Sequence, residues 1–200
     1  MAYRDFKMKD LEDKFGIQEV GTDLFDANKI KHIEPSDDLK SDIRDAKLIN
    51  LSTEKAISER LVAPILAEIR RNNDDFQIFS GEIITGDKKM GLNGEIDFIF
   101  AKTPITTKPN TPIFCVTESK IGKVIEAFPQ AIAQMLGVRE FNKSHDKNIV
   151  TIHAIVTDGK TWRILKLQNQ NALVDQTDYS TENLPLLLGV FQEIIDFYKK

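Results

Sequence analysis

An acidic residue interrupts one apolar segment of the sequence, and an acidic and a basic residue close another. Asp97 lies within residues 95–101 (EIDFIFA), while Glu118 ends the strand-like run 112–118 (PIFCVTE) and Lys120 follows two residues later. Carboxylates are rarely buried without partners, and the second run is almost entirely apolar. Charged residues in these places therefore indicate either chemistry or a specific ion pair.

The three charged residues have the types and spacing of a divalent-cation site. Side chains alternate along a strand, so Glu118 and Lys120 point to the same face. If the two strands pair as a hairpin, Asp97 and Glu118 become near neighbours, and they repel unless a proton or cation lies between them. Mg²⁺ or Mn²⁺ would suit these ligands, with the backbone carbonyl of Ser119 as a further oxygen. Lys120 would then orient a water or stabilise negative charge on a phosphate. The spacing equally fits a purely structural ion pair of Lys120 with Asp97 or Glu118.

Other common chemistries do not fit this sequence. Its three histidines are not paired at ligand spacing, and it contains neither a phosphate-binding P-loop motif nor a Gly-x-Ser-x-Gly elbow. The single cysteine, Cys115, lies in the middle of an apolar strand. That position predicts a buried structural thiol rather than a nucleophile.

The composition predicts one globular domain over residues 1–200, with 41% hydrophobic residues and a net charge of −4. An acidic balance argues against strong nonspecific binding to nucleic acid through bulk charge alone. One cysteine excludes an internal disulfide framework. No apolar run reaches the ~18 residues of a membrane span, and the first ten residues lack the apolar region of a signal peptide. We therefore expect a soluble cytoplasmic protein without a membrane partner.

The elements that would position the charged residues follow from hydrophobic periodicity and turn signals. An amphipathic helix is predicted over residues 52–72, capped by Ser52 or Thr53 and kinked or split at Pro64. The second helix, 123–141, contains Pro129 as an awkward residue. Five strands are predicted, over residues 76–84, 95–101, 112–118, 148–157 and 160–167, with an Asp-Gly hairpin turn at 158–159 between the last two. A C-terminal helix is predicted over residues 184–198. This order predicts an α/β (α+β) fold with a mixed central sheet flanked by helices, and residues 1–50 as a solvated helical cover.

An Asp within one strand, followed by Glu-Ser-Lys at the end of the next and bracketed by two helices, resembles the PD-(D/E)xK nuclease superfamily. The similarity is greatest to the nuclease domains of type I restriction enzymes and covers about residues 52–168. It implies a restriction-endonuclease-like core. It also implies that Asp97 and Glu118 bind the divalent metal, and that Lys120 assists the attack of water on a phosphodiester.

Three further segments support this resemblance. Residues 58–66 (SERLVAPIL) are similar to the first core helix of the family, whose Glu lies near the metal, so Glu59 takes that role. Helix geometry alone does not choose between Glu59 and Glu68, since both border the apolar stripe. Residues 126–130 (EAFPQ) are similar to the family's Ala-x-x-Gln segment, which makes Gln130 the matching glutamine; a solvated helix face explains Gln130 equally well. Residues 154–162 look like the family's late hairpin.

The sequence thus predicts a nuclease that needs Mg²⁺ or Mn²⁺ and hydrolyses phosphodiester bonds of nucleic acid, with DNA as the expected form. The expected catalytic residues are Asp97, Glu118, Lys120, Glu59 and Gln130, and the expected metal ligands are Asp97, Glu118, Glu59 and Ser119. A homodimer or the subunits of a restriction or repair system are the expected protein partners. The alternative is a catalytically inactive nuclease fold that serves as a binding or assembly module.

Overall fold

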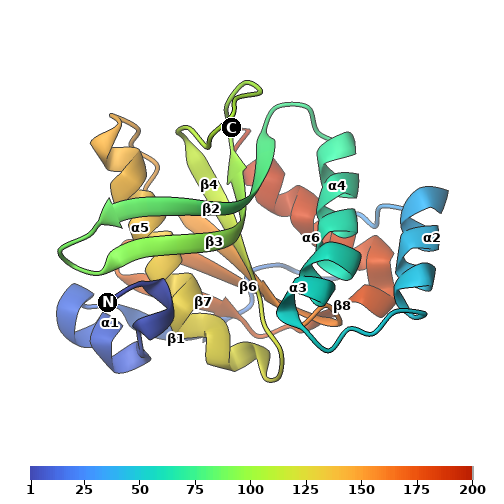
Figure 1. The fold of residues 1–200 in the computed structure, drawn as a ribbon, viewed down its shortest axis with the longest axis horizontal. Coiled ribbons are helices and arrows are strands. Elements are labelled where there is room, and N and C mark those ends of the chain that lie inside the picture. Colours follow the sequence, from blue (N-terminus) through green and yellow to red (C-terminus); the bar gives the residue numbers. More distant parts are fainter. Residues whose placement is uncertain (200) are drawn as a thin grey trace.

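The computed structural model describes residues 1–199, within which eight strands form one mixed β-sheet (Figure 1). The strand order is β1-β7-β6-β5-β4-β3-β2, and the short β8 pairs with β6. Neighbours are antiparallel except β4 with β5 and β1 with β7, which are parallel. The strands are β1 (Gln18–Thr22), β2 (Gln77–Asp87), β3 (Leu92–Ala101), β4 (Ile113–Ser119), β5 (Ile152–Thr157), β6 (Thr161–Gln168), β7 (Asn171–Asp175) and β8 (Tyr179–Ser180). The expected mixed sheet flanked by helices is confirmed.

Helices cover both faces of the sheet and create two apolar cores. One core lies between the sheet and α5, with the N-terminal segment beside it; the other lies under α2, α4 and α6. The α-helices are α1 (Met8–Phe15), α2 (Asp37–Ala46), α3 (Glu54–Ile57), α4 (Ala63–Arg71), α5 (Phe128–Ser144) and α6 (Leu184–Phe197). No helix within residues 1–199 has both the length and the apolar character needed to cross a membrane.

β4 is the central strand that its apolar sequence predicts. All seven of its residues are buried, between antiparallel β3 and parallel β5. Cys115 lies in it, fully buried, and burial raises the pKa of its thiol, which agrees with a structural role. At the start of the strand, the fully buried Asn142 of α5 is paired with Ile113. Ile113 N–H donates to Asn142 Oδ1 at 2.9 Å, and Asn142 Nδ2 donates to the Ile113 carbonyl at 2.6 Å.

The helix predicted over residues 52–72 is split before Pro64. Thr53 caps it, because its hydroxyl accepts from Ala56 N–H at 3.1 Å. α3 then continues into a π-helical turn, Ser58–Val62, in which Ala63 N–H donates to the Ser58 carbonyl five residues earlier. This wider turn ends one helical segment and begins α4, so Pro64 falls in the first turn of α4, where proline is better tolerated than in a helix interior.

Pro129 is also accommodated by its position. The second predicted helix begins as a 3₁₀ turn, Val124–Ala127, and the α-helical part starts only at Phe128. Pro129 therefore lies in the first turn of α5, where proline is favoured rather than disruptive. The hairpin at Asp158-Gly159 is confirmed: Gly159 has a φ of 86°, and Asp158 Oδ1 accepts from the backbone N–H of the residues two and three positions on.

Residues 1–50 contribute more than the helices that the sequence predicts there. Besides α1 and α2, this region supplies β1, which pairs with β7 at one edge of the sheet. Tyr3 is buried against α5 and donates its hydroxyl proton to the carbonyls of Ile84 (3.0 Å) and Leu92 (3.3 Å). A Cβ on Gly137 of α5 would overlap the Tyr3 side chain. The N-terminal segment is thus part of the core that supports the β2–β3 hairpin.

Candidate metal centre

Asp97 and Glu118 are brought together by the register of two neighbouring strands. Phe98 of β3 pairs with Thr117 of antiparallel β4, and one further step of that register places Asp97 opposite Glu118. The peptide N–H of Ser119 donates to Asp97 Oδ2 at 2.8 Å, which holds the Asp97 carboxylate against the end of β4. The two carboxylates predicted to be neighbours therefore lie side by side in the structure.

Glu118 is held from the other side by two amides of α5. Gln134 Nε2 donates to Glu118 Oε2 at 2.7 Å, and Gln130 Nε2 donates to Glu118 Oε1. Glu118 is 6% exposed and Gln134 is fully buried. The alternative explanation of Gln130 as part of a solvated helix face does not describe this structure, because the half-buried Gln130 is directed at the carboxylate.

Both carboxylates prefer the neutral form more strongly than an exposed acid would. Burial is the largest cause that raises the pKa of Asp97; the negative charges of Glu54 and Glu95 add to it, and the Ser119 N–H opposes it. Burial also raises the pKa of Glu118, followed by the charge of Asp97, while the Gln134 amide and Lys120 lower it. Two ionised carboxylates in this position require a compensating proton or cation.

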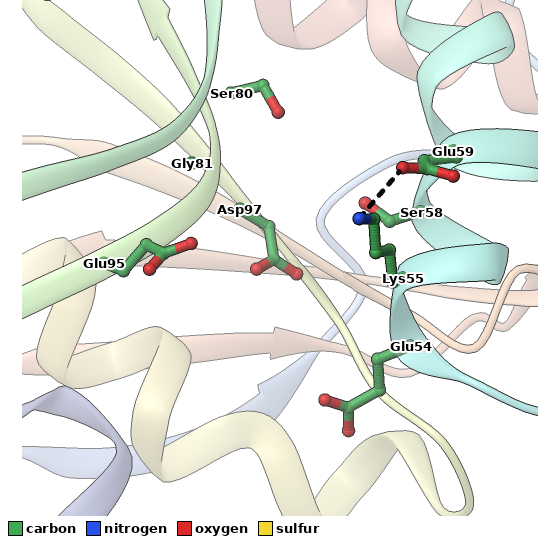
Figure 2. A pocket seen from close by; sticks show the side chains of 8 residues that line it. All are labelled: Glu54, Lys55, Ser58, Glu59, Ser80, Gly81, Glu95 and Asp97. Atoms are coloured by element: carbon green, nitrogen blue, oxygen red, sulfur yellow. Dashed lines mark ion pairs between the residues drawn. The ribbon is translucent and has the colours of Figure 1, made fainter.

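Asp97 of the pair lines a cleft of about 430 Å³ between a helical wall and the β2–β3 hairpin (Figure 2). In Figure 2 the carboxylate of Asp97 points from β3 across the cleft towards the helical wall, and Glu95 lies beside it. The lining residues are Glu54, Lys55, Ser58 and Glu59 on the helical side and Ser80, Gly81, Glu95 and Asp97 on the strand side. The cleft is therefore mainly acidic, which suits a cation.

Lys120 does not form the structural ion pair that the sequence left open. Its Nζ lies 3.2 Å from Glu54 Oε1, at the start of α3, rather than against Asp97 or Glu118. The N–H of Ile121 also points to this Glu54 oxygen, at 3.5 Å. Lys120 is thereby held against Glu54, which lines the cleft, and its charge lowers the pKa of Glu118.

Three glutamates of the helical segment from α3 to α4 have different positions relative to the cleft. Glu59, the residue chosen by the resemblance, lines the cleft, and its Oε1 lies 3.8 Å from Lys55 Nζ. Glu68 is buried on the opposite side, where it accepts from Ser36 N–H at 2.8 Å and pairs with Arg71 at 2.7 Å. Glu54 is the residue that sequence reasoning missed: its charge raises the pKa of both Asp97 and Glu118. The sequence showed only that Glu54 follows the cap Thr53, which does not reveal that its side chain faces the strands.

Within residues 1–199, no three His, Cys, Asp or Glu side chains gather closely enough to enclose a metal ion. Mg²⁺ does not require such a cage, since it is commonly held by one or two carboxylates and keeps several waters. Asp97, Glu118 and the Ser119 carbonyl form a hard-oxygen donor set of this kind. The residues therefore fit Mg²⁺ or Mn²⁺. Comparisons with models of known protein families, with curated proteins and with solved structures found no match to this chain.

Proposed function

We propose that this chain is a nuclease of the PD-(D/E)xK type that uses Mg²⁺ or Mn²⁺ to hydrolyse phosphodiester bonds. The observation that carries the proposal is the pairing of Asp97 and Glu118 across β3 and β4, next to an acidic cleft. Burial raises the pKa of each, and the nearest lysine is paired with Glu54 instead. A structural role alone gives no reason to put two mutually repelling carboxylates together.

The arrangement of elements supports a restriction-endonuclease-like core. A helical segment (α3 to α4) precedes three antiparallel strands, β2, β3 and β4, and α5 then leads to β5, which runs parallel to β4. The sequence resemblance covers the same stretch of chain, with Asp97 in the middle strand of the three and Glu118 near the end of the third. Topology and motif thus both support Asp97 and Glu118 as residues of the proposed centre.

Each residue has a role that its position permits. Asp97, Glu118 and the Ser119 carbonyl would bind the cation, with Glu54 or Glu59 as support from the helical wall. A bound Mg²⁺ would lower the pKa of a coordinated water and neutralise charge on the phosphate. Lys120 would stabilise the negative charge that develops on the phosphate or orient the attacking water. Gln130 would hold Glu118 in place.

DNA is the proposed substrate because the resemblance points to restriction enzymes, and a homodimer or restriction-system subunits are the proposed protein partners. Cleavage of a panel tests the reaction and its substrate: plasmid, linear duplex, single-stranded DNA and RNA, each with Mg²⁺, Mn²⁺ or EDTA. We expect cleavage of a DNA substrate that EDTA abolishes and that Asp97→Asn lacks. Glu82→Gln, which changes a β2 carboxylate outside the cleft lining, is the matched control and should cleave normally.

Thermal unfolding with and without Mn²⁺ provides an independent measurement. Wild type should unfold at a higher temperature when Mn²⁺ is added, and Asp97→Asn should not respond. Mn²⁺-dependent stabilisation without cleavage would indicate an intact site that lacks its partner or true substrate. Neither cleavage nor stabilisation would reject the nuclease and favour a binding or assembly module.

A further inference from the structure

The buried side-chain amide of Gln134 makes a single hydrogen bond, to Glu118. The side chain is fully buried in α5, and its Nε2 donates to Glu118 Oε2 at 2.7 Å. Its Oε1 is buried without a hydrogen-bond partner. An apolar residue of the same size would remove this unpaired acceptor, so packing alone does not explain a glutamine at this position. The contact with Glu118 does.

A second amide, one helical turn earlier, completes the arrangement. Residues four apart share a helix face, and Gln130 donates to the other oxygen of the same carboxylate. Each oxygen of Glu118 therefore has its own amide donor from α5. Rotating the Glu118 carboxylate about its terminal bond would break at least one of these hydrogen bonds.

A carboxylate with a fixed orientation discriminates between cations. Mg²⁺ demands nearly octahedral oxygen ligands at about 2.0–2.1 Å, whereas Ca²⁺ takes more ligands at about 2.3–2.6 Å and often uses both oxygens of one carboxylate. Asp97 is also fixed, by the Ser119 N–H at 2.8 Å. Neither carboxylate is free to adjust to the larger, more irregular coordination of Ca²⁺.

We propose that Gln134 is a positioning residue which, with Gln130, fixes Glu118 so that the centre selects Mg²⁺ and Mn²⁺ over Ca²⁺. This inference rests on the proposed function, since it takes Asp97 and Glu118 as the cation ligands. The competing explanation is that Gln134 only links α5 to β4. The two differ in what a change at Gln134 does to cation affinity.

Isothermal titration calorimetry with MnCl₂, MgCl₂ and CaCl₂ distinguishes a positioning role of Gln134 from a purely structural one. Wild type should bind Mn²⁺ and Mg²⁺ more tightly than Ca²⁺. Gln134→Met keeps the length of the side chain and removes its N–H donor, so we expect a loss of Mn²⁺ affinity of about 10–100-fold and a smaller preference over Ca²⁺. Gln130→Met should shift the preference in the same direction. Because Gln130 is partly exposed, that variant tests the inference even if Gln134→Met folds poorly.

Asn142→Leu is the matched control, since it removes another fully buried amide that joins α5 to β4. It should lower the unfolding temperature and leave the Ca²⁺-to-Mn²⁺ affinity ratio unchanged. Wild-type affinities in both glutamine variants, or an equal shift of the ratio in Asn142→Leu, would overturn the role of Gln134 alone. A wild type that binds none of the three cations would overturn the metal centre and the proposed function together with it.

Discussion

Buried amides of α5 hold β4 at both of its ends, and the two contacts differ in what they leave unpaired. At the start of the strand, Asn142 uses both amide atoms on the backbone of Ile113. At its end, Gln134 uses one atom on the side chain of Glu118 and leaves Oε1 without a partner. A buried polar atom without a partner destabilises a fold by about 1–3 kcal/mol. The first contact therefore satisfies all the groups that it joins, whereas the second holds the Glu118 carboxylate and leaves one buried acceptor unpaired.

The largest effect on cleavage should come from a change just after the C-terminal end of β4, at Lys120. Lys120→Ala should reduce cleavage by at least about 100-fold, because it removes the charge that would stabilise the reacting phosphate. Its unfolding temperature should hardly move, since the Lys120–Glu54 pair is partly exposed and such pairs contribute about 0–1 kcal/mol. Cleavage rate and thermal unfolding measured on the same preparation check both statements. A large loss of stability would instead make Lys120 a structural residue.

At the start of β4, where Asn142 contacts Ile113, a substitution should lower stability and leave cleavage unchanged. Asn142→Leu removes both hydrogen bonds from the Asn142 amide to the backbone of Ile113 inside the core, at a cost of about 1–3 kcal/mol for each backbone group left unpaired. Urea denaturation followed by circular dichroism measures this loss. Below its unfolding temperature, the variant should cleave at the wild-type rate. Wild-type stability would show that the Asn142 contact does not anchor β4.

The stability of Glu118→Gln should depend on pH differently from that of wild type. Burial, followed by the charge of Asp97, raises the pKa of Glu118 above its ordinary value of 4.5. The unfolded chain therefore loses this proton at lower pH than the folded protein does, and wild type loses stability as the pH rises from 4.5 through the raised value. Glutamine carries no such charge. Without metal, the variant should match wild type at low pH and exceed it progressively above that window.

Urea denaturation at a series of pH values, in EDTA, measures this difference. Asp87→Asn is unsuitable as a control, because Asp87 accepts hydrogen bonds from the turn of the β2–β3 hairpin. Glu82→Gln, outside the cleft lining, serves instead and should follow wild type. A constant difference between Glu118→Gln and wild type at all pH values would contradict the raised pKa of Glu118.

The smallest effects should distinguish the two glutamates of the helical wall. Glu54→Gln removes a charge that acts on both carboxylates and is paired with Lys120, so cleavage should fall about 10-fold. Glu59→Gln removes only an exposed partner of Lys55 and should stay within about twofold of wild type. Single-turnover rates at saturating Mg²⁺ provide the measurement. The reverse ranking would restore Glu59 as the supporting residue.

The sequence predicted the central part of the site because strands follow simple rules. Alternation and hairpin pairing were enough to place Asp97 beside Glu118, and the apolar run of β4 was enough to identify the central strand. The short edge strand β1 and its neighbour β7 were missed because each has only five residues, and local alternation is weak in β1, where four of the five residues are exposed. Their pairing is fixed by the rest of the sheet.

The helical side of the site was harder to predict because a helical wheel does not say what faces each side chain. The pattern treats amides and carboxylates as solvent-facing groups, yet Gln134 is fully buried and Glu68 is nearly so. Both side chains have partners that lie far away in the sequence, Glu118 for Gln134 and Ser36 for Glu68. Glu54 was missed for the same reason, since its relation to Lys120 depends on where the helix lies against the sheet.

The π-helical turn at Ser58–Val62 sets the direction in which the side chains of α3 point relative to those of α4. Each residue of an α-helix advances by about 100°, so the extra residue of a π turn rotates everything before it by about that angle relative to α4. Glu54 upstream of the turn and Ser58 at its start line the cleft; downstream, Ile65 and Ile69 face the core. Deleting one residue of the turn would convert it to regular helix and swing Glu54 away from Lys120. The spacing between Thr53 and Pro64 is thus a fixed length in this protein, unlike the mostly exposed stretch 47–52 before it, in which only Leu51 packs against the core.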